Sequence, residues 1–125
     1  MDITPLVAKG RQLIQGYGDG GFRISESRHE GPVLVFPTET RPWPVSDPAD
    51  ITPASLEAVF EAAADIEILV IGCGGRFLAP PVGLREALKD AGIVLEWMDT
   101  GAACRTFNVL LTEDRLAAAA LIAVD

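Results

Sequence analysis

Residues 68–98 read ILVIGCGGRFLAPPVGLREALKDAGIVLEWM, and this stretch decides the fold. Residues 68–71 form a β-branched run of strand length, and residues 93–98 form a second apolar run of the same kind. Between the two runs, apolar residues recur at helical spacing at Leu84, Ala87, Leu88 and Ala91. Gly92 then marks the end of that helix. The pattern predicts a β-α-β unit whose two strands are parallel, because such a crossover returns the chain in the same direction.

A polar segment, residues 99–108, follows the second strand directly and has the composition of a helix start. Because parallel strands end at the same sheet edge, we expect this segment to meet the glycine-rich turn after the first strand in one crevice. The free N–H groups of a first helical turn attract anions there. The candidate ligand-binding or partner-binding residues of this crevice are Gly72, Gly74, Asp99, Thr100, Cys104, Arg105, Thr106 and Asn108.

Each candidate also has a structural explanation. Asp99 and Thr100 are residues that commonly cap helices, and Gly72 and Gly74 are residues that allow a sharp turn. The glycine pattern does not complete a dinucleotide fingerprint, since Phe77 stands where the third glycine is required. Both explanations remain open at this point.

Cysteine and histidine chemistry is sparse. A helix N-terminus and Arg105 would lower the pKa of the Cys104 thiol, but the only histidine is His29, which we expect in a surface turn. The alternative for Cys104 is a buried, inert side chain. Cys73 and Cys104 lack zinc-site spacing, and we expect both to be reduced. We therefore expect no catalytic residues, no metal site and no cofactor.

The remaining segments complete an α/β pattern. Residues 14–18 and 22–24 flank a glycine-rich turn and predict a hairpin, and residues 33–36 predict a strand buried on both faces. Five prolines make residues 37–53 irregular, and Trp43 within them either anchors a partner or covers the core. A helix is predicted to open at Thr52 and Pro53, and residues 113–115 predict a charged turn. The alanine-rich residues 116–124 favour helix by propensity, and residues 3–9 are too short and proline-broken to assign.

Composition limits the classes of function. The chain has 125 residues, 49% of them hydrophobic, which fits one globular domain over residues 1–125. The net charge of −8 opposes binding to nucleic acid or anionic membranes. The longest apolar run has far fewer than the roughly 20 residues of a membrane helix, and the N-terminus lacks targeting character. We expect a soluble, cytoplasmic protein without an integral membrane segment.

A longer set of motifs resembles a known family. These motifs are Gly16-Tyr17-Gly18 with Phe22, the loop Trp43, Ile71-Gly72-Cys73-Gly74, and the stretch from Met98 to Leu110 that reads MDTGAACRTFNVL. Together they resemble the mitochondrial complex I assembly factor 3 family, from about residue 14 to residue 122. Family members often carry threonine at the position of Cys73, which argues against a redox role for it. The resemblance implies three layers (β/β/α): a central mixed sheet with the parallel β-α-β unit, a small second antiparallel sheet, and helices on one side. It also implies that residues 115–124 form a strand.

The resemblance has implications for function as well. The mitochondrial members bind other assembly factors and subunits of the respiratory NADH dehydrogenase, without established catalytic residues. Because the chain lacks the presequence of a mitochondrial precursor, it resembles a bacterial relative. We therefore expect a bacterial partner-binding or assembly module rather than an enzyme, peripheral to the membrane through a protein partner. The alternative is a small-molecule (anion) binding protein or an enzyme that uses the crevice between residues 72–74 and 99–108.

Overall fold

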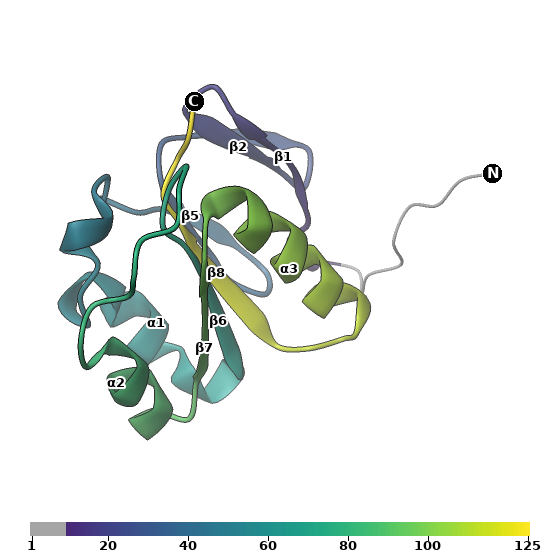
Figure 1. Cartoon of the computed structure of the whole chain (residues 1–125). Helices are drawn as coiled ribbons and strands as arrows, with labels where there is room; N and C mark the ends of the chain where they lie inside the picture. The colour runs from purple at the N-terminus through teal and green to yellow at the C-terminus, as the bar shows by residue number, and fades with distance from the viewer. Residues whose placement is uncertain (1–9) are drawn as a thin grey trace.

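The computed structural model describes residues 10–125, so the unassigned segment 3–9 lies outside the described residues. A large sheet has the strand order β5-β4-β8-β6-β7 (Figure 1). Its strands are β4 Val33–Val35, β5 Thr40–Pro42, β6 Ile68–Gly72, β7 Val94–Met98 and β8 Ala117–Leu121. β6 pairs in parallel with both β7 and β8, whereas β4 pairs antiparallel with β8 and β5. The predicted parallel β-α-β unit is confirmed, with β6 in the interior of the sheet.

Three helices cover this sheet. They are α1 Glu57–Glu61, α2 Leu84–Asp90 and α3 Thr100–Thr112. α1 and α2 pack on the face that carries Leu69 and Ile71, whereas α3 packs on the face that carries Val70. Gly92, with a φ of +83°, ends α2 in the left-handed conformation, as its place in the sequence predicts.

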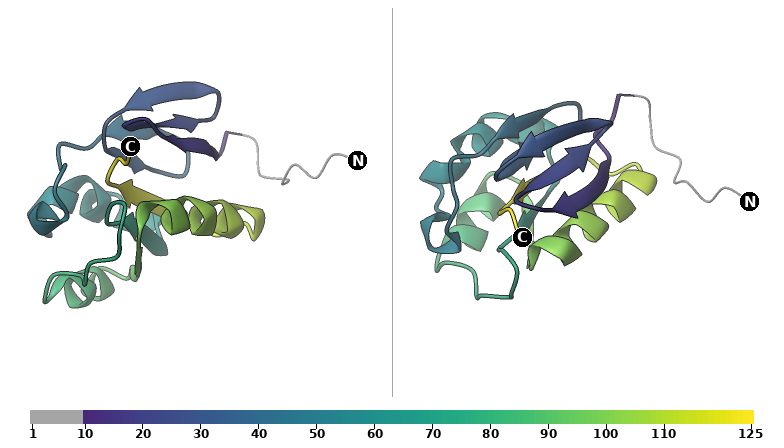
Figure 2. Two further views of the ribbon diagram at one scale, coloured as in Figure 1. Left: turned by 45° about the horizontal axis from the view of Figure 1, so that its top comes forward. Right: turned by 90° about the horizontal axis from the view of Figure 1, so that it is seen from above.

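A second sheet has the order β1-β2-β3, with β1 Ile14–Gly18, β2 Gly21–Ile24 and β3 Ser27–Glu30. Phe22 and Ile24 join α3 in covering the Val70 face of the large sheet. Figure 2 shows the small sheet stacked over the large one, with α2 on the opposite side. The mixed α/β class with two sheets is confirmed. α3 is the exception to the expected placement of helices on one side, because it shares a face with the small sheet.

β8 shows how packing overrides helix propensity. Its residues 117–121 read AAAAL, and every one of them is buried. β8 lies between β4 and β6, and its alternate side chains enter the two cores on opposite faces of the sheet. The strand implied by the family resemblance is therefore confirmed, since a central strand buried on both faces can use small residues of low strand propensity.

β3 was not predicted, and the expectation that His29 lies in a surface turn is wrong. His29 lies within β3 and is paired with Phe22 of β2. The connecting residues Ser25 and Glu26 both have positive φ, 46° and 73°, which makes a tight hairpin turn. The sequence of β3 reads SRHE and has no apolar alternation, so hydrophobic periodicity could not reveal it.

The proline-rich segment is mostly irregular, as predicted, apart from β5 and the short 3₁₀ helix Pro48–Asp50. The predicted helix after Thr52 is divided into the 3₁₀ helix Ala54–Leu56, α1, and the 3₁₀ helix Ala63–Asp65. The Thr52 hydroxyl accepts a hydrogen bond from the Ser55 N–H at 3.2 Å, which confirms its capping role. In residues 10–125 no helix is both long enough and apolar enough to cross a membrane.

Candidate functional site

The start of α3 is hydrogen-bonded to the two segments that directly follow β6 and β8. The Asp99 carboxylate accepts a hydrogen bond from the Ala102 N–H at 3.3 Å and so caps the helix. Thr100 is fully buried, and its hydroxyl donates to the Ile122 carbonyl at 2.7 Å and accepts from the Gly74 N–H at 3.0 Å. The Thr100 N–H donates to the Gly74 carbonyl at 2.9 Å. The structure therefore brings Gly74 and Thr100 together, as the sequence predicts.

The expected crevice between these residues is closed. A Cβ atom added at Gly72 would lie 2.8 Å from the Thr100 Cα and 2.9 Å from its hydroxyl oxygen. Such distances leave no room for a ligand between Gly72 and Thr100. Gly72 is thus required for close backbone approach, and the polar groups of Thr100 are satisfied within the protein.

Arg105 and Asn108 face a different part of the molecule. The Asn108 side chain accepts from the Ile14 N–H at 3.0 Å and donates to the Ile14 carbonyl at 2.7 Å. The Arg105 guanidinium donates to the Tyr17 hydroxyl at 3.2 Å, and a Cβ at Gly101 would lie 2.7 Å from that hydroxyl. These residues join β1 to α3, so the expected anion pocket shared by Arg105 and the 72–74 turn does not form. A cavity of about 220 Å³ lies at the joint.

Both cysteines are buried free thiols. Burial raises the pKa of the Cys104 thiol to about 12, although the neighbouring Arg105 acts in the opposite direction. The Cys73 sulfur lies 3.5 Å from the Arg76 carbonyl oxygen. The Thr106 hydroxyl lies 3.2 Å from the Met98 sulfur. A buried thiol with a raised pKa is a poor nucleophile, so Cys104 fits the inert alternative.

Trp43 is 2% exposed and belongs to the core that α1 and α2 cover. Its indole N–H donates to the Ser55 carbonyl at 2.8 Å. Of the two alternatives drawn from the sequence, the structure shows the core-covering one. Trp43 does not present a surface to a partner.

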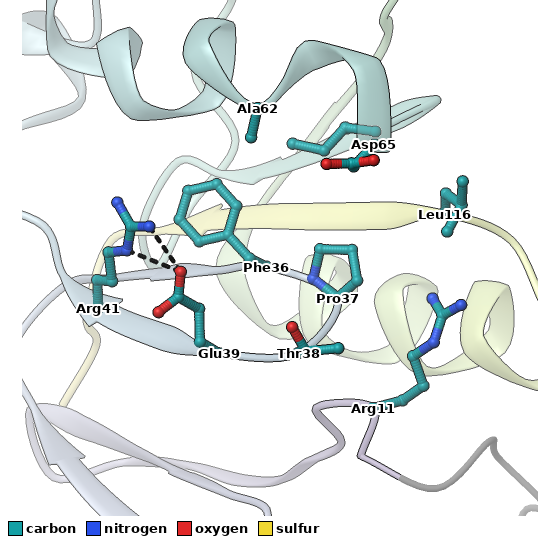
Figure 3. Close-up of a pocket in the computed structure, with 10 residues that line it drawn as sticks. Arg11, Phe36, Pro37, Thr38, Glu39, Arg41, Ala62, Asp65 and Leu116 are labelled. Carbon is teal, nitrogen blue, oxygen red and sulfur yellow. Dashed lines mark hydrogen bonds and ion pairs between the residues drawn. The ribbon is translucent and has the colours of Figure 1, made fainter.

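The cavity in Figure 3 has a volume of about 330 Å³ and lies beside the turn that connects β4 and β5. The Arg41 guanidinium is 4.8 Å from the centre of the Phe36 ring and donates to the Glu39 carboxylate. Arg11 and Asp65 line other parts of the wall. Two of the charged residues that line the cavity, Arg41 and Glu39, thus form an ion pair with each other. The residues that line the cavity include no histidine, cysteine or serine for nucleophilic catalysis. Within residues 10–125, no three histidine, cysteine or acidic residues are placed to hold a metal ion.

Exposed apolar side chains also occur elsewhere on the surface, on β7 and on the loop that precedes α2. Phe77, Leu78 and Val82 of this loop are 62%, 41% and 106% exposed, and Val94 of β7 is 57% exposed. The Trp97 indole N–H donates to the Leu78 carbonyl and so holds the loop beside β7. The sequence analysis did not single out these exposed residues, although apolar residues in a loop rich in glycine and proline can indicate surface exposure.

A protein-family model of unknown function, DUF498/DUF598, matches residues 14–122 of the chain. The chain belongs to this family. The match covers both sheets and all three helices, so it includes the joint between β1 and α3 and the surface at β7.

Several curated relatives of the chain are named NADH dehydrogenase [ubiquinone] 1 alpha subcomplex assembly factor 3. The zebrafish (Danio rerio) protein is 40% identical over 98% of the chain and 70% of its own length. The human protein is 37% identical over 87% of the chain and 59% of its own length. The chain therefore spans about 60–70% of the length of these curated relatives. The resemblance to the complex I assembly factor 3 family is confirmed.

Solved structures agree with the fold. The crystal structure of an outer membrane protein from Bartonella henselae has a TM-score of 0.86 and 41% identity, over 93% of this chain and 98% of that one. The arrangement of two sheets around α3 is thus shared with an experimentally determined structure.

Proposed function

We propose that this family member is a protein-binding module that serves the assembly of a larger complex. The observation that carries the proposal is its similarity, over nearly the whole chain, to proteins named complex I assembly factor 3. The partners would be assembly proteins or subunits of a respiratory NADH dehydrogenase. The proposal places the chain in the bacterial cytoplasm, held at the membrane by its partner.

The geometry of the sequence-derived candidate residues supports binding over catalysis. Thr100 and Asn108 each use their polar atoms in hydrogen bonds within the protein. Asp99 caps α3, and the thiol of Cys104 is buried with a raised pKa. Catalytic groups need access to substrate and a suitable protonation state, and these four residues serve the scaffold instead.

Affinity purification from the organism that encodes the chain tests the proposal. The tagged chain, expressed at its native level, should retain a protein partner in fixed stoichiometry, identified by mass spectrometry and recovered again when that partner carries the tag. A broad activity screen of the purified chain is the counterpart. Turnover that disappears in Asp99→Asn or Arg105→Ala, with the circular dichroism spectrum unchanged, would overturn the proposal in favour of an enzyme.

A second candidate function is binding of a small anion, placed at the cavity of about 220 Å³ between Tyr17 and Arg105. The observation that favours it is the exposed Arg105 guanidinium at the wall of that cavity. Calorimetric titration with phosphate and with acetate decides it. Binding in the micromolar range that is lost in Arg105→Ala would support this candidate.

A further inference from the structure

β7 forms one edge of the large sheet, with β6 as its only neighbouring strand. The Val94 N–H donates to the Glu67 carbonyl, and the Met98 carbonyl accepts from the Cys73 N–H, so residues 94, 96 and 98 bond towards the preceding strand. In a parallel pair the intervening residues direct their N–H and C=O groups the other way. Leu95 and Trp97 therefore present main-chain groups at the outer edge of β7.

The Leu95 carbonyl points to the outer edge of β7, away from β6, because it accepts a hydrogen bond of 2.7 Å from the Arg85 guanidinium of α2. For the Leu95 N–H and for both main-chain groups of Trp97, no hydrogen-bonding partner lies among residues 10–125. Unpaired strand edges are templates for another strand, and native proteins usually protect them.

Two of the other three sheet edges, β5 and β3, carry such protection. β5, at the opposite edge of the large sheet, contains Pro42, which lacks an N–H, and Arg41, which is paired with Glu39. β3 at an edge of the small sheet is short and reads SRHE, with charged or polar side chains throughout. β7 by contrast reads VLEWM, contains no proline, and has a single charged residue; the Arg85 guanidinium covers its Leu95 carbonyl but leaves the Leu95 N–H and the main chain of Trp97 open. Among these edges, β7 is the one suited to pairing.

We infer that the outer edge of β7 takes up an extended segment of a partner protein as an additional strand, with an apolar side chain beside Val94 and a lysine or arginine beside Glu96. This inference rests on the proposed function and names its surface. Main-chain pairing supplies affinity in such strand addition, and alternate side chains supply specificity. Val94 is 57% exposed and Glu96 is exposed on the same face of the strand, so both lie where a neighbouring strand would cover them. The loop that precedes α2, with the exposed residues Phe77 and Leu78, is joined to β7 by the hydrogen bond from the Trp97 indole to the Leu78 carbonyl.

The net charge of the chain favours a different protein, rather than a second copy of this chain, as the partner at β7. Each copy has a net charge of −8, so two copies repel each other. Antiparallel pairing of two β7 strands about Glu96 would also place two carboxylates directly opposite, which destabilises a sheet. A basic residue beside Glu96 meets the opposite charge, and a basic segment also suits the net charge of the chain. Arg85 and Lys89 of α2 lie near Val94 and Leu95, so the basic residue of the segment belongs beside Glu96 and an apolar one beside Val94.

The test uses the full chain in lysate of its own organism, with a photo-crosslinking amino acid at position 94 and, as the control, at position 27 of β3. Position 94 should crosslink to an extended segment of another protein, and position 27 should not.

Val94→Lys and Glu96→Lys should each reduce capture of that protein about tenfold or more, whereas Ser27→Lys should leave it unchanged. Thermal melts confirm that the variants fold, which is expected because both substituted side chains are exposed. In the purified complex, the amide hydrogens of Leu95 and Trp97 should exchange more slowly than in the free chain.

The contrary outcomes separate the two proposals. A partner captured equally by wild type, Val94→Lys and Glu96→Lys, or unchanged exchange at Leu95 and Trp97, would overturn the β7 inference and leave the proposed function standing. Crosslinking of position 94 to a second copy of this chain would overturn the inferred partner. Failure of the wild-type chain to capture any protein would overturn the proposed function and this inference with it.

Discussion

Replacing Thr100 by valine tests whether the start of α3 is a structural joint. Valine keeps the branched shape and volume of threonine but removes the hydroxyl, which bonds the Ile122 carbonyl and the Gly74 N–H. Both partners would be left in a buried position without this hydrogen bond, at about 1–3 kcal/mol each. We expect the free energy of unfolding to fall by about 2–6 kcal/mol, a large part of the roughly 5–15 kcal/mol typical of a domain.

The matched control is Thr106→Val in the same helix. The Thr106 hydroxyl contacts the Met98 sulfur, a weak acceptor, and this substitution should cost less than about 1 kcal/mol. Urea unfolding followed by circular dichroism at 25 °C, with linear extrapolation to water, measures both variants. If Thr100→Val and Thr106→Val lose the same free energy, within about 0.5 kcal/mol, the joint does not have the importance assigned to it.

Three further predictions concern the same region. Gly72→Ala should destabilise the chain by about 1–3 kcal/mol because its Cβ would overlap the backbone of α3, whereas Gly75→Ala, whose Cβ would meet its nearest neighbour at 4.0 Å, should change thermal stability little. Asn108→Ala should lower the free energy of unfolding by about 1–3 kcal/mol and speed amide exchange in β1. Arg105→Ala loses one exposed hydrogen bond and should lower it by less than about 1 kcal/mol. Equal losses of unfolding free energy in urea for the two variants would contradict this expectation. Since burial raises the pKa of Cys104 to about 12 in the folded chain, the unfolded thiol ionises first: this contribution to stability is complete below about pH 9 and is lost as the pH rises towards 12. Between pH 9 and pH 11 the unfolding free energy should therefore fall less steeply in Cys104→Ala than in the wild type, by up to about 1.4 kcal/mol per pH unit, and parallel pH profiles would refute the raised pKa.

Periodicity predicted the elements that depend on local apolar patterning. The β-α-β unit, the first hairpin and the buried strand β4 were all visible in this way, because each buries a regular apolar face. β3 was not, since an edge strand with polar side chains has no such pattern. β8 required the family resemblance, because its alanines favour helix in isolation and become a strand only between β4 and β6.

The candidate site was predictable in sequence position and only partly in geometry. The sequence placed Thr100 beside the Gly72–Gly74 turn, because parallel strands end together. The sequence could not show that Gly72 and Thr100 are in close contact, because the distance between them depends on how closely α3 packs on the end of β6. It also could not direct Arg105 and Asn108 towards β1, which is some ninety residues earlier in the chain. Tertiary contacts of that range are not encoded in local spacing.

The central claim is that the chain acts by binding a protein partner, and the mass of the native particle tests it most directly. The chain alone has a mass of 13.3 kDa. Size-exclusion chromatography with light scattering, applied to the tagged chain purified gently from its own organism, should give a larger particle that contains a second, different polypeptide in fixed ratio. A particle with the mass of the tagged chain alone, or a multiple of that mass with no other polypeptide, would contradict the claim.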